Sequence, residues 1–219
     1  MAVPLMTVVL AAGKGTRMRS DTPNVLHRIA GRSMLGHVLD RVGTVAPERQ
    51  VVVVGPGMEI VEAEARAAGS NIETCVQADQ RGTADAVLAA ATALAAHRGD
   101  VMVLFADTPL LRAETLVRMR EMLEGGAGVA VLGFEAADPT GYGRLVVEHG
   151  ELVAVREELD ASPAERAIEL CNAGAMGLAG ATALAVLERI RDDNRKRELY
   201  LTDAVAVARE MGLKTVVIE

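Results

Sequence analysis

The chain has 219 residues, 50% of them hydrophobic, so it can bury the core of one large domain. Its formal net charge of -7 argues against a general nucleic-acid-binding protein, because such proteins present a basic surface to phosphates. Any phosphate-binding site would therefore have to be local.

Cysteine usage and the apolar segments favour a cytoplasmic protein. Cys75 and Cys171 lie far apart in apolar stretches, without the spacing of a zinc or redox site, so we expect buried free thiols. The apolar run over residues 3–12 has no basic region before it, and a loop rather than a cleavage site follows it. No other segment has the length of a membrane span. We therefore expect a cytoplasmic location and no membrane contact.

Short runs rich in β-branched residues recur along the chain, with helical patterns between many of them. This alternation predicts an α/β fold, a Rossmann-like mixed but mainly parallel sheet flanked by helices. The predicted strands are residues 7–10, 51–54, 101–105, 129–132, 145–147 and 215–218.

The first predicted strand leads into a basic loop that contains Gly13 and Gly15. Such a loop presents backbone N–H groups, and glycine lets a ligand approach the main chain, which suits a nucleotide phosphate. The loop is not a P-loop, because Val8 occupies the position of the first glycine in that motif. It also lacks the third glycine of the dinucleotide fingerprint. From these two glycines alone, an ordinary tight turn is at least as good an interpretation.

Three helices are predicted from their starting residues. The first begins after Ser33, a good cap, and the second is an alanine-rich stretch that follows Gly82 and Thr83. The third follows Thr202 and Asp203. The expected helices run from Met34 to near Gly43, over residues 84–96, and from Ala204 to a terminator at Gly212.

Polar residues at two predicted strand ends are candidates for a site. Asp107 follows the apolar strand 101–105, and open α/β sheets bind ligands at the carboxyl ends of their strands. Its carboxylate suits magnesium, but Asp107 could equally cap the next helix. Gln77 offers both a donor and an acceptor, as a nucleotide base requires, although it also fits as a polar residue that merely ends a strand.

The pattern changes over residues 138–160 to a turn followed by strand-like residues on both sides of His149 and Gly150. This predicts a β-hairpin in a small insertion at one edge of the core. No internal repeat or long linker marks a second domain, so we expect one domain over residues 1–219.

Seven segments resemble the motifs of the sugar-nucleotide pyrophosphorylases. The greatest similarity is to the uridylyltransferase domain of bacterial bifunctional N-acetylglucosamine-1-phosphate uridylyltransferases. The segments occur in the family's order across nearly the whole chain. They are residues 10–18 followed by Pro23, residues 77–84, 106–110 and 141–144, Glu157 with residues 160–161, residues 172–174 and residues 200–203.

The resemblance implies a role for each matched position. Arg17 would be the main cationic catalyst, and Asp107 would act in catalysis as the ligand of a Mg²⁺ cofactor. The implied nucleotide-binding residues are Leu10, Ala11, Ala12, Gly13, Asn24, Gln77, Gly82 and Thr83. The implied contacts to the amino sugar and nearby ribose are Gly143, Glu157, Asn172 and Thr202, and residues 138–175 would contribute the sugar-binding insertion.

The implied reaction forms UDP-N-acetylglucosamine and pyrophosphate from UTP and N-acetylglucosamine-1-phosphate, a step in making cell-wall precursors. A sugar-phosphate oxygen would attack the α-phosphorus of UTP, with in-line positioning and charge neutralisation as the sources of catalysis. The partners would be these small molecules. The sequence does not specify an oligomeric state, and we expect no acetyltransferase β-helix domain of the kind found in the bifunctional members.

One position departs from the family. The motif ends in Pro-Lys, whereas this chain has Pro23 and Asn24, so a neutral amide replaces a cation. The lost charge could weaken transition-state stabilisation by ~2 to 4 kcal/mol. The alternatives are a nucleotide-sugar-binding homologue with weak or lost catalysis, and a transferase for another sugar phosphate or nucleotide.

Overall fold

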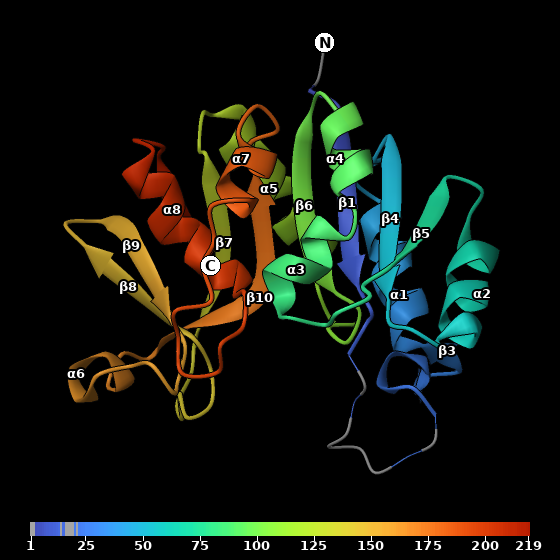
Figure 1. Ribbon diagram of the computed structural model, residues 1–219, viewed down its shortest axis with the longest axis horizontal. Helices are drawn as coiled ribbons and strands as arrows, with labels where there is room; N and C mark the ends of the chain where they lie inside the picture. The colour runs from blue at the N-terminus through green and yellow to red at the C-terminus, as the bar shows by residue number, and fades with distance from the viewer. Residues whose placement is uncertain (1–2, 14, 16–19, 21) are drawn as a thin grey trace.

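A computed structural model describes residues 3–13, 15, 20 and 22–219 (Figure 1). Within this part of the chain, nine strands form one sheet. They are β1 (Leu5–Leu10), β4 (Arg49–Val54), β5 (Ile72–Val76), β6 (Asp100–Phe105), β7 (Val129–Glu135), β8 (Arg144–Glu148), β9 (Glu151–Arg156), β10 (Leu170–Leu178) and β11 (Thr215–Ile218).

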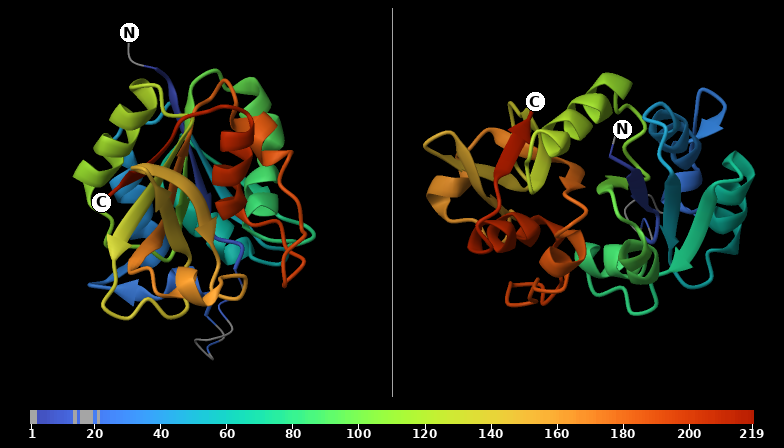
Figure 2. Two further views of the ribbon diagram at one scale, coloured as in Figure 1. Left: turned by 90° about the vertical axis from the view of Figure 1, so that its left-hand side faces the viewer. Right: turned by 90° about the horizontal axis from the view of Figure 1, so that it is seen from above.

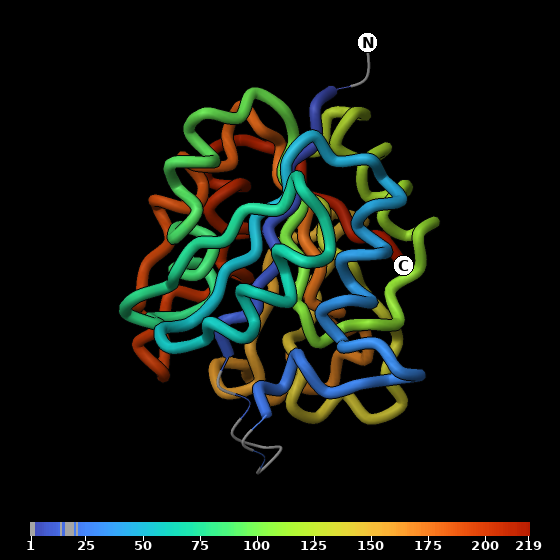
Figure 3. The backbone as a smooth tube through the Cα atoms, turned by 90° about the vertical axis from the view of Figure 1, so that its right-hand side faces the viewer, coloured from blue at the N-terminus to red at the C-terminus, as the bar shows by residue number. Residues whose placement is uncertain are grey.

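The sheet has the order β11-β7-β10-β6-β1-β4-β5, and β8 joins it through β10. The pairs around β1 are parallel, as is β11 with β7, whereas β10 runs antiparallel to both β6 and β7. Strand β5 forms the edge nearest the viewer in Figure 3. The predicted mixed, mainly parallel sheet is confirmed.

Helices cover both faces of the sheet (Figure 2). Helices α1, α2 and α5 pack on one face, and α3, α4, α7 and α8 pack on the other. The helices are α1 (Met34–Gly43), α2 (Glu59–Ala68), α3 (Thr83–Leu88), α4 (Ala91–Ala96), α5 (Ala113–Glu124), α6 (Pro163–Arg166), α7 (Ala183–Leu187) and α8 (Ala204–Glu210), with 3-10 turns η2 (Asn24–Leu26) and η3 (Leu201–Asp203). A two-stranded sheet, β2 (Arg28–Ile29) and β3 (Arg32–Ser33), precedes α1.

The side chains of β1 alternate between the two cores. Met6 and Val8 pack with the α3 side, while Leu5 and Val9 pack with the α1 side. A strand buried on both faces favours apolar residues on both sides rather than at every second position, which is why β1 is apolar except for the buried Thr7. Because both faces are covered, the carboxyl ends of the strands are the places left for a site.

Every predicted strand is present, but β5 and β10 were not predicted. Strand β5 is the end strand of the sheet that the described residues form, and it carries the polar residues Glu73 and Thr74, so its sequence lacks a continuous apolar run. Strand β10 contains Gly174 and changes register between Asn172 and Met176. A bulged strand of this kind lacks the regular alternation that sequence reasoning depends on.

The alanine-rich stretch 84–96 is two short helices rather than the one predicted helix. Helix α3 ends at Leu88 and α4 begins at Ala91, and at the break the Ala90 N–H donates to the Val87 oxygen, three residues back, at 3.0 Å. Nothing in this run of strong helix formers marks the break. The helix after Ser33 is confirmed, and the Ser33 hydroxyl accepts from the Gly36 N–H at 3.0 Å.

The predicted hairpin is confirmed as β8 and β9, which turn at His149 and Gly150, both with positive φ. From Leu170 onward, however, the chain belongs to β10 in the middle of the main sheet. The expected insertion over 138–175 therefore divides into a hairpin at the sheet's edge and the beginning of a central strand.

Both cysteines are free thiols, with Cys171 buried as expected and Cys75 only partly buried at the sheet's edge strand. Burial raises the pKa of the Cys75 thiol to about 11, which keeps it protonated and unreactive near neutral pH. Across the described residues, none of the helices is both long enough and apolar enough to span a bilayer.

Candidate functional site

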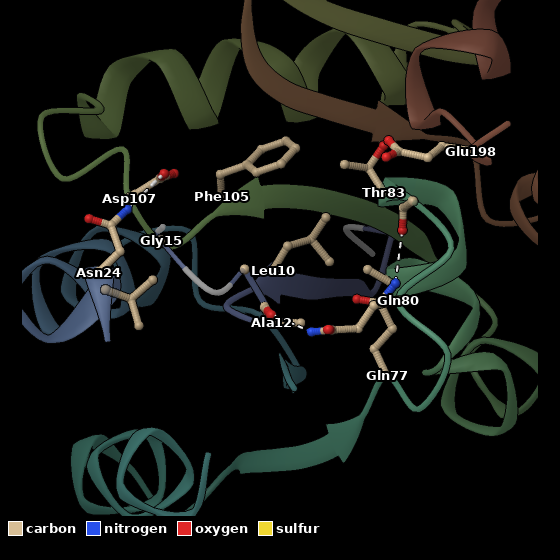
Figure 4. A pocket seen from close by; sticks show the side chains of 14 residues that line it. Leu10, Ala12, Gly15, Asn24, Gln77, Gln80, Thr83, Phe105, Asp107 and Glu198 are labelled. Carbon is tan, nitrogen blue, oxygen red and sulfur yellow. Dashed lines mark hydrogen bonds between the residues drawn. The ribbon is translucent and has the colours of Figure 1, made fainter. Parts of the chain in front are cut away.

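A pocket of about 550 Å³ opens at the carboxyl ends of β1 and β6 (Figure 4). These two strands are parallel neighbours, so the loops that follow them leave the sheet side by side. The segment between β5 and α3 forms the opposite wall. The lining residues are Leu10, Ala12, Gly13, Gly15, Asn24, Val25, Gln77, Gln80, Gly82, Thr83, Ala86, Phe105, Asp107 and Glu198.

The loop after β1 offers the pocket mainly its backbone. Leu10 and Ala12 are only 7% and 5% exposed, and Gly13 has no side chain. The Gln80 side chain holds this loop in place, since its amide nitrogen donates to the Ala12 oxygen at 2.8 Å. Ala11 differs from its neighbours because it packs into the core on the α1 side and does not line the pocket.

Asn24 and Asp107 meet at one end of the pocket. The Asn24 side-chain nitrogen donates to the Asp107 carboxylate over 3.4 Å, a long contact. Gly15 lies against Asn24, so closely that a Cβ added at Gly15 would stand 2.5 Å from the Asn24 Cβ. Asn24 and Asp107, which are 83 residues apart in the sequence, are therefore neighbours at the site.

Asp107 does not cap a helix. Helix α5 begins only at Ala113, where Arg112 holds the capping position and makes no side-chain cap bond. The Asp107 carboxylate is exposed at the pocket, with Asn24 as its one side-chain partner among the described residues. The sequence allowed Asp107 to be a helix cap or a ligand-binding carboxylate. The structure excludes the cap, and the second interpretation stays a prediction.

A single carboxylate is compatible with magnesium, which is commonly held by one or two carboxylates together with substrate phosphates and water. The described residues contain no cluster of three or more His, Cys, Asp or Glu that could enclose a metal ion on their own. Asp107 therefore fits a magnesium ion that arrives with a phosphate substrate.

Gln77 is buried at the other end of the pocket, with 6% of its surface exposed. Its amide nitrogen donates to the Gly82 oxygen at 2.9 Å and to the Asp85 carboxylate at 2.7 Å. Gly82 has φ 129° and ψ -178°, a conformation that is essentially restricted to glycine. The wall at this end is therefore built from a buried amide and a glycine turn.

A distant segment is bonded to this turn and connects it to a second pocket. The Leu199 N–H donates to the Arg81 oxygen, the Ala84 N–H donates to the Leu199 oxygen, and each bond is 2.8 Å long. The Leu201 N–H donates to the Thr83 hydroxyl, also at 2.8 Å. These bonds place residues 199–202 directly beside the start of α3.

The four residues predicted to hold the sugar lie together. The Thr202 hydroxyl donates to the Glu157 carboxylate at 2.9 Å, and the Asn172 N–H donates to the Gly143 oxygen at 2.8 Å. A Cβ at Gly143 would lie 3.5 Å from Glu157 and 3.6 Å from Asn172. Glu157, Asn172 and Thr202 line a small pocket of about 100 Å³ that shares Thr83 and Phe105 with the larger one.

Six residues that line the larger pocket had no predicted role: Gly15, Val25, Gln80, Ala86, Phe105 and Glu198. Gln80 lies inside the matched segment 77–84, but its positive φ of 48° and its reach to Ala12 depend on tertiary structure. Phe105 ends the strand before Asp107, so its position could have been predicted. Glu198 adjoins the matched segment 200–203 and is brought in by the bonds around Leu199. Arg17, predicted as the catalytic cation, lies outside the described residues.

Asp203 follows Thr202 in the chain, in surroundings that disfavour the ionised form of its carboxyl group. Burial raises its pKa to about 6, Arg156 opposes the effect, and the nearby carboxylates of Asp193, Glu157 and Asp160 add to it. The folded chain therefore binds the Asp203 proton more tightly than the unfolded chain does. The stability that this carboxyl contributes is complete at low pH and is lost as the pH rises through about 6.

Asp203→Asn is consequently expected to raise the free energy of unfolding more at pH 8 than at pH 4. The difference between the two effects should be about 1 to 2 kcal/mol, after allowance for solvent screening of a partly exposed carboxyl. Urea unfolding of both proteins at the two pH values measures this difference. Equal effects of the substitution at pH 4 and pH 8 would contradict it.

A comparison with family models identifies the kind of domain. The model described as the MobA-like NTP transferase domain matches residues 7–206. Among solved structures, the crystal structure of UDP-glucose pyrophosphorylase complexed with UDP-glucose has a similar fold. Its TM-score is 0.80 with 16% sequence identity, over 99% of this chain and 90% of that one.

Curated relatives are similar over nearly the whole chain. The bifunctional protein GlmU of Xanthobacter autotrophicus is 58% identical over 212 residues, which are 97% of this chain and 47% of the relative. GlmU of a Bradyrhizobium species is 55% identical over 214 residues, 98% of this chain and 48% of the relative. The chain thus spans about half the length of these relatives.

Proposed function

The chain belongs to the family of MobA-like NTP transferase domains, and we propose that it transfers a uridylyl group from UTP to a sugar-1-phosphate with release of pyrophosphate. The observation that carries this proposal is the pair of adjacent pockets, which have two lining residues in common. The larger has room for a nucleotide, and the smaller, lined by hydroxyl, amide and carboxylate groups, shares Thr83 and Phe105 with it. A site of this form accommodates the two halves of a nucleotide sugar.

We propose N-acetylglucosamine-1-phosphate as the sugar substrate and UDP-N-acetylglucosamine as the product. The motif resemblance implies this sugar, and the similar proteins named GlmU support it. The polar groups of Glu157, Asn172 and Thr202 suit the hydroxyl and amide groups of an amino sugar, since together they offer both donors and acceptors.

In the proposed reaction, an oxygen of the sugar phosphate forms a bond to the α-phosphorus of UTP as the bond from that phosphorus to the bridging oxygen breaks, and pyrophosphate leaves. The backbone after β1, with Gly13, would receive the phosphates, and Gln77 and Gly82 would hold the base. Catalysis would come from alignment of the two substrates and from cations at the phosphates.

Asp107 would hold magnesium, which when bound would offset the negative charge of the phosphates. Arg17 would supply a second positive charge, as the motif implies. We also propose a cytoplasmic location, because the two free thiols, Cys75 and Cys171, fit a reducing compartment.

Pyrophosphate release with UTP, N-acetylglucosamine-1-phosphate and magnesium tests the proposal directly. We expect release that depends on both substrates, and UDP-N-acetylglucosamine should appear in equal amount. If calorimetry detects binding of UDP-N-acetylglucosamine but no pyrophosphate is released, the proposed uridylyltransferase activity is refuted. That result would support a nucleotide-sugar-binding protein instead. That second candidate is favoured by one observation, the neutral Asn24 that contacts Asp107 where the family has a cation.

Asn24→Lys is expected to raise the rate of pyrophosphate release by about thirty-fold or more, the equivalent of ~2 kcal/mol. A lysine here would restore a positive charge beside Asp107 and the phosphates, and charge-assisted hydrogen bonds are roughly twice as strong as neutral ones. Steady-state assays give kcat for each protein. Asn24→Met, similar in length but uncharged, is the control and should not gain activity; an equal gain in both variants would rule out the charge as the cause.

A further inference from the structure

The Gln77 amide has a fixed orientation, and the chemistry of its neighbours determines it. Its two contacts on one side are the Gly82 carbonyl oxygen at 2.9 Å and the Asp85 carboxylate at 2.7 Å. Both groups only accept hydrogen bonds when Asp85 is ionised. The side of the amide that faces them must therefore be the NH₂ group, because reversing it would place oxygen against oxygen.

The carbonyl oxygen of Gln77 is consequently the atom left for a ligand. The amide nitrogen donates to the Gly82 oxygen, and Figure 4 shows the amide oxygen of Gln77 on the other branch, on the side of Leu10. No donor among the described residues bonds to this oxygen, and it is not among their buried polar atoms that lack a partner. The pocket therefore presents an acceptor at this position.

We propose that Asp85 is a positioning residue that makes Gln77 select a base with a ring N–H over a base with a bare ring nitrogen. This rests on the proposed function, in which the base lies at Gln77. Uracil carries an N–H at N3, which can donate to the Gln77 oxygen. Cytosine has an acceptor at N3, so the same approach would place two acceptors against each other without a proton, an unpaired contact costly in a buried site.

Asp85 is well placed for this task because its own position is fixed. The same carboxylate oxygen that accepts from Gln77 accepts from the Arg81 N–H at 3.1 Å, across the Gly82 turn. Without the carboxylate, the amide could rotate by 180°, since its nitrogen could then point into the pocket and donate to cytosine N3. Gly82 alone would oppose this reversal with one contact in place of two.

Binding of UTP and CTP, measured by calorimetry, tests the inference without requiring turnover. We expect the unmodified chain to bind UTP at least about ten-fold more tightly than CTP, and Asp85→Asn to reduce that ratio below about three-fold. Asparagine keeps the size of the side chain but can donate to a reversed Gln77. Asp85→Ser is the second variant, because serine also removes the carboxylate and is accepted near helix starts.

The control and the double variant separate positioning from a structural role. Asp79→Asn removes an exposed carboxylate in the same segment and should leave the ratio unchanged. In a Gln77→Ala background, Asp85→Asn should have no further effect on the ratio, because the group that it positions is absent. If Asp85 only stabilised the start of α3, its loss would weaken the binding of UTP and CTP equally, and the ratio of their affinities would stay the same.

Three results would overturn the inference: an unmodified chain without preference for UTP, an unchanged ratio in both Asp85 variants, or a full effect of Asp85→Asn in the Gln77→Ala background. Absence of pyrophosphate release by the unmodified chain would instead count against the proposed enzyme. The binding ratio would still be measurable in that case, so the two failures are distinguishable.

Discussion

Asp107→Asn is expected to lower kcat for pyrophosphate release by roughly a thousand-fold, as for the loss of one preorganised charge-stabilising group. Asp107 is exposed at the pocket and follows the carboxyl end of β6, where its carboxylate contacts Asn24. Asparagine keeps its shape and can still contact Asn24, so the fold should not change. Steady-state kinetics across a range of magnesium concentrations provide the measurement.

The accompanying controls separate chemistry from binding. UDP-N-acetylglucosamine binding without magnesium should change by less than about three-fold, because the carboxylate is proposed to act through a metal ion rather than by holding the base or sugar. Asp40→Asn, at a carboxylate on α1 that is 61% exposed, should behave like the unmodified chain. A loss of less than ten-fold for Asp107→Asn would refute the role proposed for this carboxylate.

Gly82→Ala is expected to lower the free energy of unfolding by about 3 to 5 kcal/mol and to abolish tight UTP binding. The added Cβ would stand 2.5 Å from the Leu199 oxygen and 2.7 Å from its nitrogen, which are backbone atoms that cannot rotate away. The two backbone hydrogen bonds that Leu199 makes to Arg81 and Ala84 would be strained or lost. Urea unfolding and nucleotide calorimetry measure the two effects.

Gly43→Ala is the matched control for this substitution. Gly43 lies in the last turn of α1, and an added Cβ there meets no atom of the described residues within 4 Å. Alanine should therefore be neutral or stabilising by up to about 1 kcal/mol, since it is the better helix former. Similar losses of stability at both glycines would show that the contact with Leu199 is not the cause.

Much of the architecture follows from local sequence, and the reason is visible in β1. A strand buried on both faces is mostly apolar, as β1 is at every position but Thr7, so its sequence identifies it without knowledge of its neighbours. The cap at Ser33 and the turn at His149 and Gly150 are also short-range features. The strand β10 is different, because its irregular register is set by its partners β6, β7 and β8.

The candidate site also combines features set by local sequence with features set by long-range contacts. Asp107 could be placed at a strand end from the sequence, but its contact with Asn24 joins residues 83 positions apart. The orientation of the Gln77 amide depends on Gly82 and Asp85, and only the folded turn brings them together. The motifs thus indicated residues that the structure places at the candidate pockets, whereas the hydrogen-bond partners of those residues depend on long-range contacts.

The wall shared by the two pockets means that base choice and sugar choice cannot be redesigned independently. Thr83 and Phe105 face both cavities, and the Thr83 hydroxyl also accepts the Leu201 N–H from the segment that carries Thr202. A smaller residue at Phe105, introduced to admit a bulkier sugar, would also widen the nucleotide pocket. Libraries that aim at a new sugar-1-phosphate substrate should therefore be screened against several nucleotides at once, with Thr83 and Phe105 varied together.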